Sequence, residues 1–138
     1  MSYLLDTNVL SELKRRSPDV GVVEWFARRP ASTLYLSVLT LGEVRKGIEG
    51  LADTGRRTVL LDWLETDLPA FFSSRMLPVD VRVADRWGRL QAASGRPVPA
   101  IDSLLAATAL AHDLMLVTRN VRDFIGFGLQ VIDPWSAA

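Results

Sequence analysis

Four acidic residues of this sequence stand where a side chain could take part in chemistry. Asp6 directly follows the short apolar run Tyr3-Leu4-Leu5, and Asp102 lies near the start of a predicted helix. Glu43 and Asp123 lie on other predicted elements. An acid that follows a buried apolar strand is costly unless it is hydrogen-bonded, paired or bound to a metal ion. These four residues are therefore the candidates for a carboxylate site.

Each acid also has an ordinary structural explanation. Asp6 is suited to cap the next helix, and Asp102 would complement a helix dipole. Glu43 stands three residues before Lys46, which is the spacing of a surface ion pair, and Asp123 is of a residue type that fixes turns. For Glu43 and for Asp123 taken singly, the structural explanation is the favoured one. For Asp6 and Asp102, a structural and a functional role remain equally open.

Taken together, the acids favour binding of a divalent cation. Like charges gathered in one place repel, and some carboxyl groups would protonate unless cations intervene. The chain has no cysteine, and its one histidine, His112, comes late in a predicted helix, where it would interact with the helix dipole. A site built from oxygen ligands selects hard ions, Mg²⁺ or Mn²⁺, over zinc.

Length and composition narrow the class of protein. A chain of 138 residues suits one domain, and 49% hydrophobic with 23% charged residues is ordinary for a globular protein. The formal net charge of zero excludes a uniformly cationic coat but leaves local basic patches open. The lack of cysteine excludes thiol catalysis. Neither a basic leader nor a run near the ~20 apolar residues of a membrane span is present, so we expect a cytoplasmic protein without a membrane partner.

Strands and helices are predicted to alternate along the chain. Apolar runs predict strands over residues 3–5, 33–38, 76–79, 114–118 and 129–132, with Pro78 confining the third to a sheet edge. Apolar residues at helical spacing predict helices from residue 7 or 8, from 18 to 30, and over 40–48, 56–68, 81–94 and 100–112. Pro69 is expected to end the helix over 56–68, and Gly95 to cap the helix over 81–94. Residues 119–124 are expected to form a loop or a short helical turn.

This alternation indicates an α/β fold with three layers, α/β/α, around a mostly parallel central sheet. In such folds, sites form at the carboxyl ends of the strands. Asp6 and Thr118 are predicted at two of these ends. The fold class therefore gives a physical reason for acids that are far apart in the sequence to meet.

Four segments of the chain resemble, in order, the motifs of the PIN-domain family. They are Leu-Leu-Asp-Thr-Asn-Val-Leu-Ser-Glu at 4–12, Ser-Val-Leu-Thr-Leu-Gly-Glu-Val at 37–44, Ala-Ile-Asp-Ser-Leu-Leu-Ala-Ala-Thr-Ala at 100–109 and Val-Thr-Arg-Asn-Val-Arg-Asp-Phe at 117–124. The closing Val-Ile-Asp-Pro-Trp at 131–135 is similar to the VapC/FitB-type branch of that family. The resemblance runs nearly end to end, and the motifs together are highly specific.

The resemblance implies a single PIN-like nuclease domain over residues 1–138. Its activity would be that of a Mg²⁺- or Mn²⁺-dependent endoribonuclease, the toxin of a type II toxin–antitoxin pair. A small VapB-like antitoxin would occlude the site. A homodimer and a toxin–antitoxin hetero-oligomer are the expected assemblies, and RNA is the expected substrate.

The family's acidic positions map directly onto Asp6, Glu43 and Asp102. The fourth position is open between two residues. Asn120 stands where some relatives carry an acid, and the nearest acid is Asp123. An amide can coordinate a metal ion or hold a water but supplies no charge, so Asp123 is the fourth candidate and Asn120 a supporting one.

Three further residues, Thr7, Asn8 and Thr118, are expected to hydrogen-bond the carboxylates. In the mechanism that follows from the resemblance, Asp6 and Asp102 hold the main cation. Glu43 orients the attacking water or shares a second ion, and Asp123 completes the set when substrate arrives. RNA would then be hydrolysed by metal-activated water.

Two basic segments are candidate RNA tracks: residues 14–16, and the face of Arg82, Arg86 and Arg89. For either segment, the plainer explanation is a solvated surface. The apolar positions Trp25, Phe26, Leu60, Leu61 and Leu64 would serve a dimer, an antitoxin groove or, more commonly, the core.

Two other functions compete with the ribonuclease. A strand that ends in aspartate is typical of phosphatases of the HAD type, but those enzymes need a second aspartate two residues on, where this chain has Asn8. A non-catalytic module with an acidic pocket would bind a partner and cleave no RNA. Dinucleotide-binding and phosphate-loop motifs are absent from the sequence, and a serine hydrolase would lack its nucleophile motif.

Overall fold

A computed structural model describes residues 1–135 of the chain. Within them, five strands form one sheet in the order β3-β2-β1-β4-β5, and every neighbouring pair is parallel. The strands are β1 (Tyr3–Leu5), β2 (Leu34–Ser37), β3 (Met76–Leu77), β4 (Met115–Val117) and β5 (Val131–Ile132). All five predicted strands are therefore present, and β3 lies at a sheet edge as Pro78 requires.

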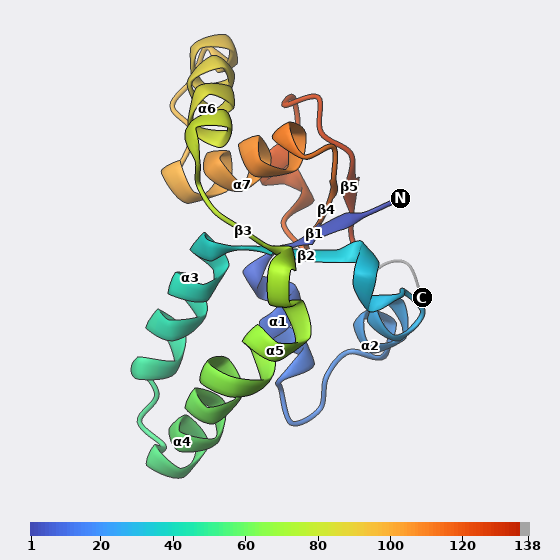
Figure 1. The fold of residues 1–138 in the computed structure, drawn as a ribbon, viewed down its shortest axis with the longest axis vertical. Helices are drawn as coiled ribbons and strands as arrows, with labels where there is room; N and C mark the ends of the chain where they lie inside the picture. Colours follow the sequence, from blue (N-terminus) through green and yellow to red (C-terminus); the bar gives the residue numbers. More distant parts are fainter. Residues whose placement is uncertain (136–138) are drawn as a thin grey trace.

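Helices cover both faces of the sheet, which confirms the predicted three-layer α/β/α architecture (Figure 1). On one side lie α1 (Thr7–Leu13), α2 (Val20–Ala27), α3 (Val38–Glu49), α4 (Thr54–Asp62) and α5 (Leu68–Phe72). On the other side lie α6 (Val81–Ser94) and α7 (Ala100–Ala111). Short 3₁₀ turns occur at Ala31–Thr33, Ser73–Arg75 and Val121–Phe124, the last where a loop or short turn is predicted.

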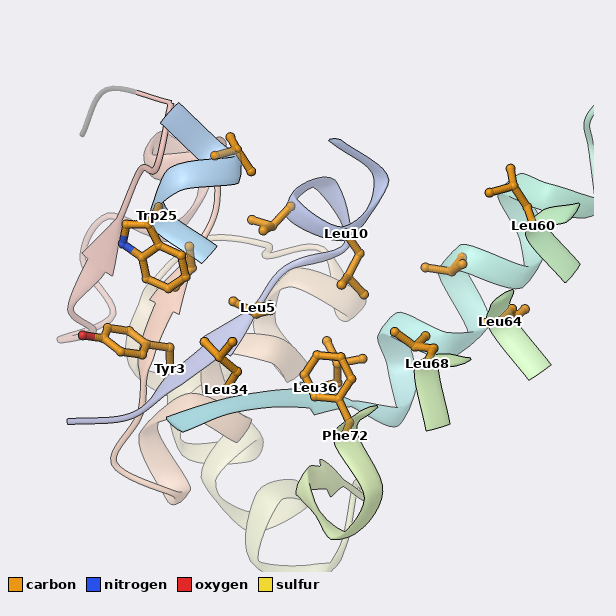
Figure 2. Packing of buried hydrophobic residues seen from close by; sticks show 14 of the residues in the cluster. Tyr3, Leu5, Leu10, Trp25, Leu34, Leu36, Leu60, Leu64, Leu68 and Phe72 are labelled. Atoms are coloured by element: carbon orange, nitrogen blue, oxygen red, sulfur yellow. The ribbon is translucent and has the colours of Figure 1, made fainter. Parts of the chain in front are cut away.

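The central strand β1 is buried on both faces, as expected for a parallel sheet between helical layers. Successive side chains of a strand point to opposite faces, so Tyr3 and Leu5 join the larger hydrophobic cluster while Leu4 joins the smaller one. Figure 2 shows the larger cluster, in which Tyr3 and Trp25 meet edge to face with their ring centres 5.0 Å apart.

The predicted apolar stripes belong mainly to this core. Trp25, Leu60 and Leu64 are buried in the larger cluster, and Phe26 and Leu61 are partly buried against it. Of the three interpretations of these positions, the core is the one that the structure supports for the buried residues.

Several helices begin earlier or later than predicted because capping side chains set their first turns. The Ser37 hydroxyl accepts a hydrogen bond from the backbone N–H of Leu39, so α3 starts at Val38 and not at Thr40. The Asp19 carboxylate caps α2, which starts after it and not at Pro18. The capping residues, and not the apolar pattern, therefore set the residue at which each of these helices begins.

The prediction that Pro69 ends a helix is wrong. A π-helical segment, Trp63–Asp67, follows α4 and leads directly into α5, and Pro69 lies in the first turn of α5. A proline lacks an N–H and clashes with the carbonyl four residues earlier in a regular α-helix. The wider π-helical segment just before Pro69 is the local change that lets the helical path continue.

The predicted arginine face of α6 is largely engaged in structural contacts. Arg82 donates a hydrogen bond to the carbonyl of Ala111 at the end of α7, and Arg89 pairs with Asp85 at 3.2 Å. Arg82, and not His112, thus supplies the cation at the end of α7. Burial, and then the nearby Arg82, lowers the pKa of His112 and favours its neutral form.

Gly95 ends α6 in the left-handed conformation, with φ of 67°, as the sequence predicts. No helix in the described part of the chain is long and apolar enough to cross a membrane.

Candidate active site

The first two residues of the site meet because β1 and β4 are neighbours in the sheet. Asp6 follows β1 and Thr118 follows β4, and the N–H of Asp6 donates to the carbonyl of Val117 at 2.9 Å. The Thr118 hydroxyl then donates to Oδ2 of Asp6 at 2.8 Å, joining residues that are 112 positions apart. From β1 the chain adds β2 and β3 on one side of the sheet and β4 and β5 on the other, so the strand order reverses between β1 and β4. Open α/β sheets bind their ligands at such a reversal.

The structure confirms the capping interpretation of Asp6 and also places this residue at a cleft. It is the N-cap of α1, where its Oδ1 accepts from the N–H of Thr7 at 2.7 Å. It also lines an open cleft of about 430 Å³ at the carboxyl edge of the sheet. Only 7% of the residue is exposed. A capping carboxylate is thus held in place at the wall of a cleft.

Glu43 reaches the same cleft from α3. Its Oε1 accepts from the Thr7 hydroxyl at 2.6 Å, so α1 and α3 are tied together beside Asp6. No ion pair between Glu43 and Lys46 occurs among residues 1–135. The surface pairing that would explain Glu43 structurally is therefore not formed.

Asp102 enters the cleft from the first turn of α7, on the other side of the sheet. The small residues that follow it, Ala106, Ala107 and Ala109, are fully buried and let this helix pack closely on the sheet. The half-buried carboxylate of Asp102 forms no ion pair with any described residue.

The carboxylates affect one another electrostatically. Burial raises the pKa of Asp6 above its usual range, and the negative charges of Glu43 and Asp102 raise it further, while the hydrogen bonds from Thr118 and Thr7 act in the opposite direction. Burial also raises the pKa of Asp102, followed by the charges of Asp123 and Glu43. Acids from four segments of the chain therefore share one electrostatic environment.

The two candidates for the fourth position lie on the same short segment. Asn120 lines the cleft. Asp123 is exposed in the 3₁₀ turn Val121–Phe124 and does not line the cleft, but it is close enough to raise the pKa of Asp102. The structure therefore brings both residues near the site, Asn120 at its wall and Asp123 beside Asp102.

The supporting polar residues form a network behind the acids. The Asn8 amide and the N–H of Asn120 both donate to the Thr118 hydroxyl oxygen at 3.1 Å. The N–H of Arg119 donates to Oδ1 of Asn8 at 3.3 Å. Thr118, fully buried, thus connects α1, the end of β4 and Asp6. Together with the N–H of Thr7, this network holds both carboxylate oxygens of Asp6.

The chemistry of these donors suits a hard divalent cation. The acids present oxygen atoms only, and none of Asp6, Glu43 and Asp102 is paired with a lysine or arginine within residues 1–135. As they stand, no three His, Cys, Asp or Glu side chains of that part of the chain form a group able to hold a metal ion. Binding would therefore draw the carboxylates toward one another, and a cation there would offset the repulsion that, after burial, contributes to the raised pKa values of Asp6 and Asp102.

The sequence interpretation missed several residues that line the cleft. Besides the predicted ones, these are Ser11, Glu12, Arg119 and Trp135, whereas Arg15 belongs to the predicted basic segment 14–16. Asn8, Ser11 and Glu12 follow the i, i+3, i+4 spacing of one helix face, and this polar stripe could have revealed Ser11 and Glu12.

Glu12 is the most buried of these missed residues. Only 5% of it is exposed. Its Oε2 accepts from the N–H of Asp19 at 2.9 Å, and its Oε1 lies 3.3 Å from Nη1 of Arg15. Glu12 thus fixes the connection between α1 and α2 and holds Arg15 at the edge of the cleft.

The profile of the PIN domain matches residues 3–126 of the chain. The chain therefore belongs to the PIN-domain family, as its motifs indicate. The VapC ribonuclease Y4jK of Sinorhizobium fredii is 37% identical over 138 residues, covering 98% of this chain and 99% of the relative.

Two solved structures share the fold. The crystal structure of FitAcB from Neisseria gonorrhoeae superposes with a TM-score of 0.90 at 34% identity, covering 97% of this chain and 99% of that one. A toxin–antitoxin complex from Klebsiella pneumoniae superposes with a TM-score of 0.67 at 26% identity, covering 96% and 98% of the two chains. The predicted resemblance to the VapC/FitB-type branch is thus confirmed.

Proposed function

We propose that this protein is a Mg²⁺- or Mn²⁺-dependent endoribonuclease that acts as the toxin of a type II toxin–antitoxin pair. The observation that carries the proposal is the meeting of Asp6, Glu43 and Asp102 in one open cleft without a basic partner. Structural carboxylates are ordinarily paired with a cation or fully hydrogen-bonded. The name of the Sinorhizobium fredii relative, a VapC ribonuclease, supports the choice of reaction.

Asp6 and Asp102 would hold the cation, with Glu43 beside them. When bound, a divalent cation would supply the positive charge that lowers the pKa of the attacking water and stabilises the charge developing on the phosphate. Asp6 is kept in position by Thr118 and by the N–H of Thr7. These two hydrogen bonds oppose the rise in the pKa of Asp6 that burial causes, and so favour its ionised form, which is the form that binds a cation.

Glu43 would orient the attacking water, since its carboxylate is fixed by the Thr7 hydroxyl and faces the same cleft. Asn120 would supply a neutral oxygen at the cleft wall. Asp123 would act on Asp102 by charge and complete the acidic set when RNA arrives. This assignment predicts a larger loss of activity for Asp102→Asn than for Asp123→Asn.

RNA would be attracted by basic residues at the cleft and not by the protein as a whole, because the net charge is zero. Arg15 and Arg119 line the cleft itself. The face of Arg82, Arg86 and Arg89 lies on α6, where two of the three arginines already have partners. Residues 14–16 also have partners, such as Glu12 for Arg15, but Arg15 lines the cleft and no arginine of the α6 face does, so this segment is the better placed of the two predicted tracks.

The partner proposal follows from the family. The Klebsiella pneumoniae relative was solved as a toxin–antitoxin complex, and we propose a VapB-like antitoxin and a homodimer for this chain as well. Residues 1–138 would act as one nuclease domain, since both helical layers pack on the same sheet. We also propose a cytoplasmic location, where an RNA substrate would be met.

Neither alternative function is favoured. A phosphatase of the HAD type needs an acid where this chain has Asn8, and the Asn8 amide is already bonded to Thr118. A purely binding module would not need carboxylates that raise one another's pKa values. The chain also belongs to the PIN-domain family, which is not a family of HAD phosphatases.

Cleavage of RNA by the purified protein tests the proposal. We expect cleavage with Mg²⁺ or Mn²⁺, none with EDTA, and recovery when Mn²⁺ is added back. Asp6→Asn and Asp102→Asn should abolish cleavage while circular dichroism shows a retained fold. Glu65→Gln is the matched control, because Glu65 is an exposed acid paired with Arg45 away from the cleft. Variants that cut like the wild type would refute the assignment, and sequencing of the RNA ends would name the target.

A further inference from the structure

We infer that Arg119 and Trp135 form a stacking site for one unpaired base of the RNA, beside the carboxylates of the cleft. The guanidinium carbon of Arg119 lies 5.2 Å from the centre of the Trp135 ring. Both residues line the same cleft as Asp6 and Asp102. This inference rests on the proposed ribonuclease function and adds to it a recognition element for the nucleotide next to the cleaved phosphate.

The backbone holds this pair in a fixed place relative to the acids. Arg119 follows β4 and Trp135 follows β5, and these neighbouring strands are joined past their ends by the bond from the N–H of Thr118 to the carbonyl of Ile132, at 2.9 Å. The N–H of Trp135 donates to Oδ1 of Asp133 at 2.9 Å. Since Thr118 also bonds Asp6, the same short segments position both the carboxylate and the stacking pair.

The chemistry of the pair fits a nucleotide. Arg119 forms no ion pair within residues 1–135 and lines the cleft together with carboxylate, amide and hydroxyl side chains. A guanidinium group can stack on an aromatic ring while it donates to a phosphate. The half-buried indole of Trp135 lines the cleft beside the Arg119 guanidinium, and an aromatic ring next to a basic side chain is the combination that binds single-stranded nucleic acids.

Stacking on a protein side chain requires a base that is free of its own helical stack. Double-stranded RNA buries the faces of its bases, and its recognition depends on shape and backbone contacts instead. The pair therefore selects unpaired stretches of RNA. Base stacking on an aromatic side chain is worth about 1–3 kcal/mol, which corresponds to roughly 5- to 150-fold in affinity.

Equilibrium binding of a fluorescein-labelled single-stranded RNA octamer tests the inference. Binding is measured in the Asp102→Asn background, so that the RNA stays intact. Trp135→Leu should weaken binding about 5- to 150-fold, and Trp135→Phe, which keeps an aromatic ring, should recover most of the affinity. Arg119→Gln should weaken binding and lower the slope of affinity against salt by about one ion. A duplex of the same sequence should be insensitive to Trp135→Leu.

Phe127→Leu is the matched control. Phe127 also stacks on a cation, with the guanidinium carbon of Arg96 5.9 Å from its ring centre, but it does not line the carboxylate cleft. Its replacement should leave RNA affinity unchanged. Because Trp135 packs against the larger hydrophobic cluster, circular dichroism of Trp135→Leu establishes that its fold is retained.

The outcomes separate this inference from the proposed function. Equal affinity of Trp135→Leu and Trp135→Phe for the single strand would overturn the stacking site even if wild-type protein cleaves RNA. An effect of Trp135→Leu on the duplex as large as on the single strand would also overturn it. Affinity that depends on the aromatic ring in a protein that cleaves no RNA would refute the nuclease and leave the stacking site supported.

Discussion

Replacing Thr118 by valine removes the hydroxyl that holds Asp6, with little change in side-chain volume. Thr118 is fully buried and donates to a carboxylate oxygen that is itself buried, at 2.8 Å. A hydrogen bond to a charged group contributes about 1.5–3 kcal/mol. The two donors that lose the Thr118 oxygen, the Asn8 amide and the N–H of Asn120, belong to half-buried and exposed residues and can turn to water. We therefore expect Thr118→Val to lower the free energy of unfolding by about 2 kcal/mol.

The same substitution at Thr40 should have the opposite sign. Thr40 is also fully buried, but its hydroxyl has no hydrogen-bond partner among the described residues. A buried, unpaired polar group costs about 1–3 kcal/mol, so Thr40→Val should raise the free energy of unfolding by about 1 kcal/mol. The two variants share the chemical change and the degree of burial, and they differ only in what the hydroxyl contacts.

Urea unfolding in EDTA at neutral pH measures both variants. The difference between them should be about 3 kcal/mol, and the melting temperature of Thr118→Val should fall by about 6 °C at roughly 3 °C per kcal/mol. The Thr118 hydrogen bond lowers the pKa of Asp6, so the loss should be largest where Asp6 is ionised. It should shrink as the pH falls and Asp6 becomes protonated. Changes of the same sign in both variants would refute this interpretation of the network.

Two further predictions concern charge and backbone conformation. In EDTA at neutral pH, Asp102→Asn should raise the free energy of unfolding by about 0.2–1 kcal/mol, because it removes a like charge from the cleft. Since the folded state raises the pKa values of Asp6 and Asp102, it binds protons more readily than the unfolded chain. The free energy of unfolding of the wild type in EDTA should therefore increase as the pH falls and these two carboxylates become protonated. The increase should be smaller in Asp102→Asn. Urea titrations at several pH values measure both. Gly95→Ala should cost about 1 kcal/mol because φ is 67°. Gly88→Ala, inside α6 where an added Cβ would meet open space, should instead stabilise the protein by about 0.5–1 kcal/mol. Similar thermal shifts for both alanines would contradict the argument.

Much of the site could be predicted because a parallel sheet brings strand ends together. Asp6 and Thr118 end predicted strands, and their meeting requires only that β1 and β4 be neighbours. Asp102 could be placed because the small residues after it indicate a helix packed closely on the sheet. Glu43 was identified through the resemblance, since its bond to the Thr7 hydroxyl depends on how α3 crosses α1.

The remaining features depend on tertiary geometry that local patterns do not carry. Trp135 reaches the cleft only because β5 pairs with β4 and the chain turns at Asp133. Pro69 would end most helices, but here a π-helical segment absorbs the strain. Arg82 has the spacing of a solvated face, yet it reaches the last turn of α7, because α6 and α7 pack side by side.

Titration of Mn²⁺ into the RNA-free protein by calorimetry examines whether the distant acids act as one cation site. Wild-type protein should bind, and Asp102→Asn and Glu43→Gln should each lose more than about tenfold in affinity, since even changes to groups behind metal ligands cause losses of that size. Glu65→Gln, an exposed acid outside the cleft, should bind like the wild type. Unchanged Mn²⁺ affinity in Asp102→Asn and Glu43→Gln would contradict the proposal that these carboxylates form one cation site.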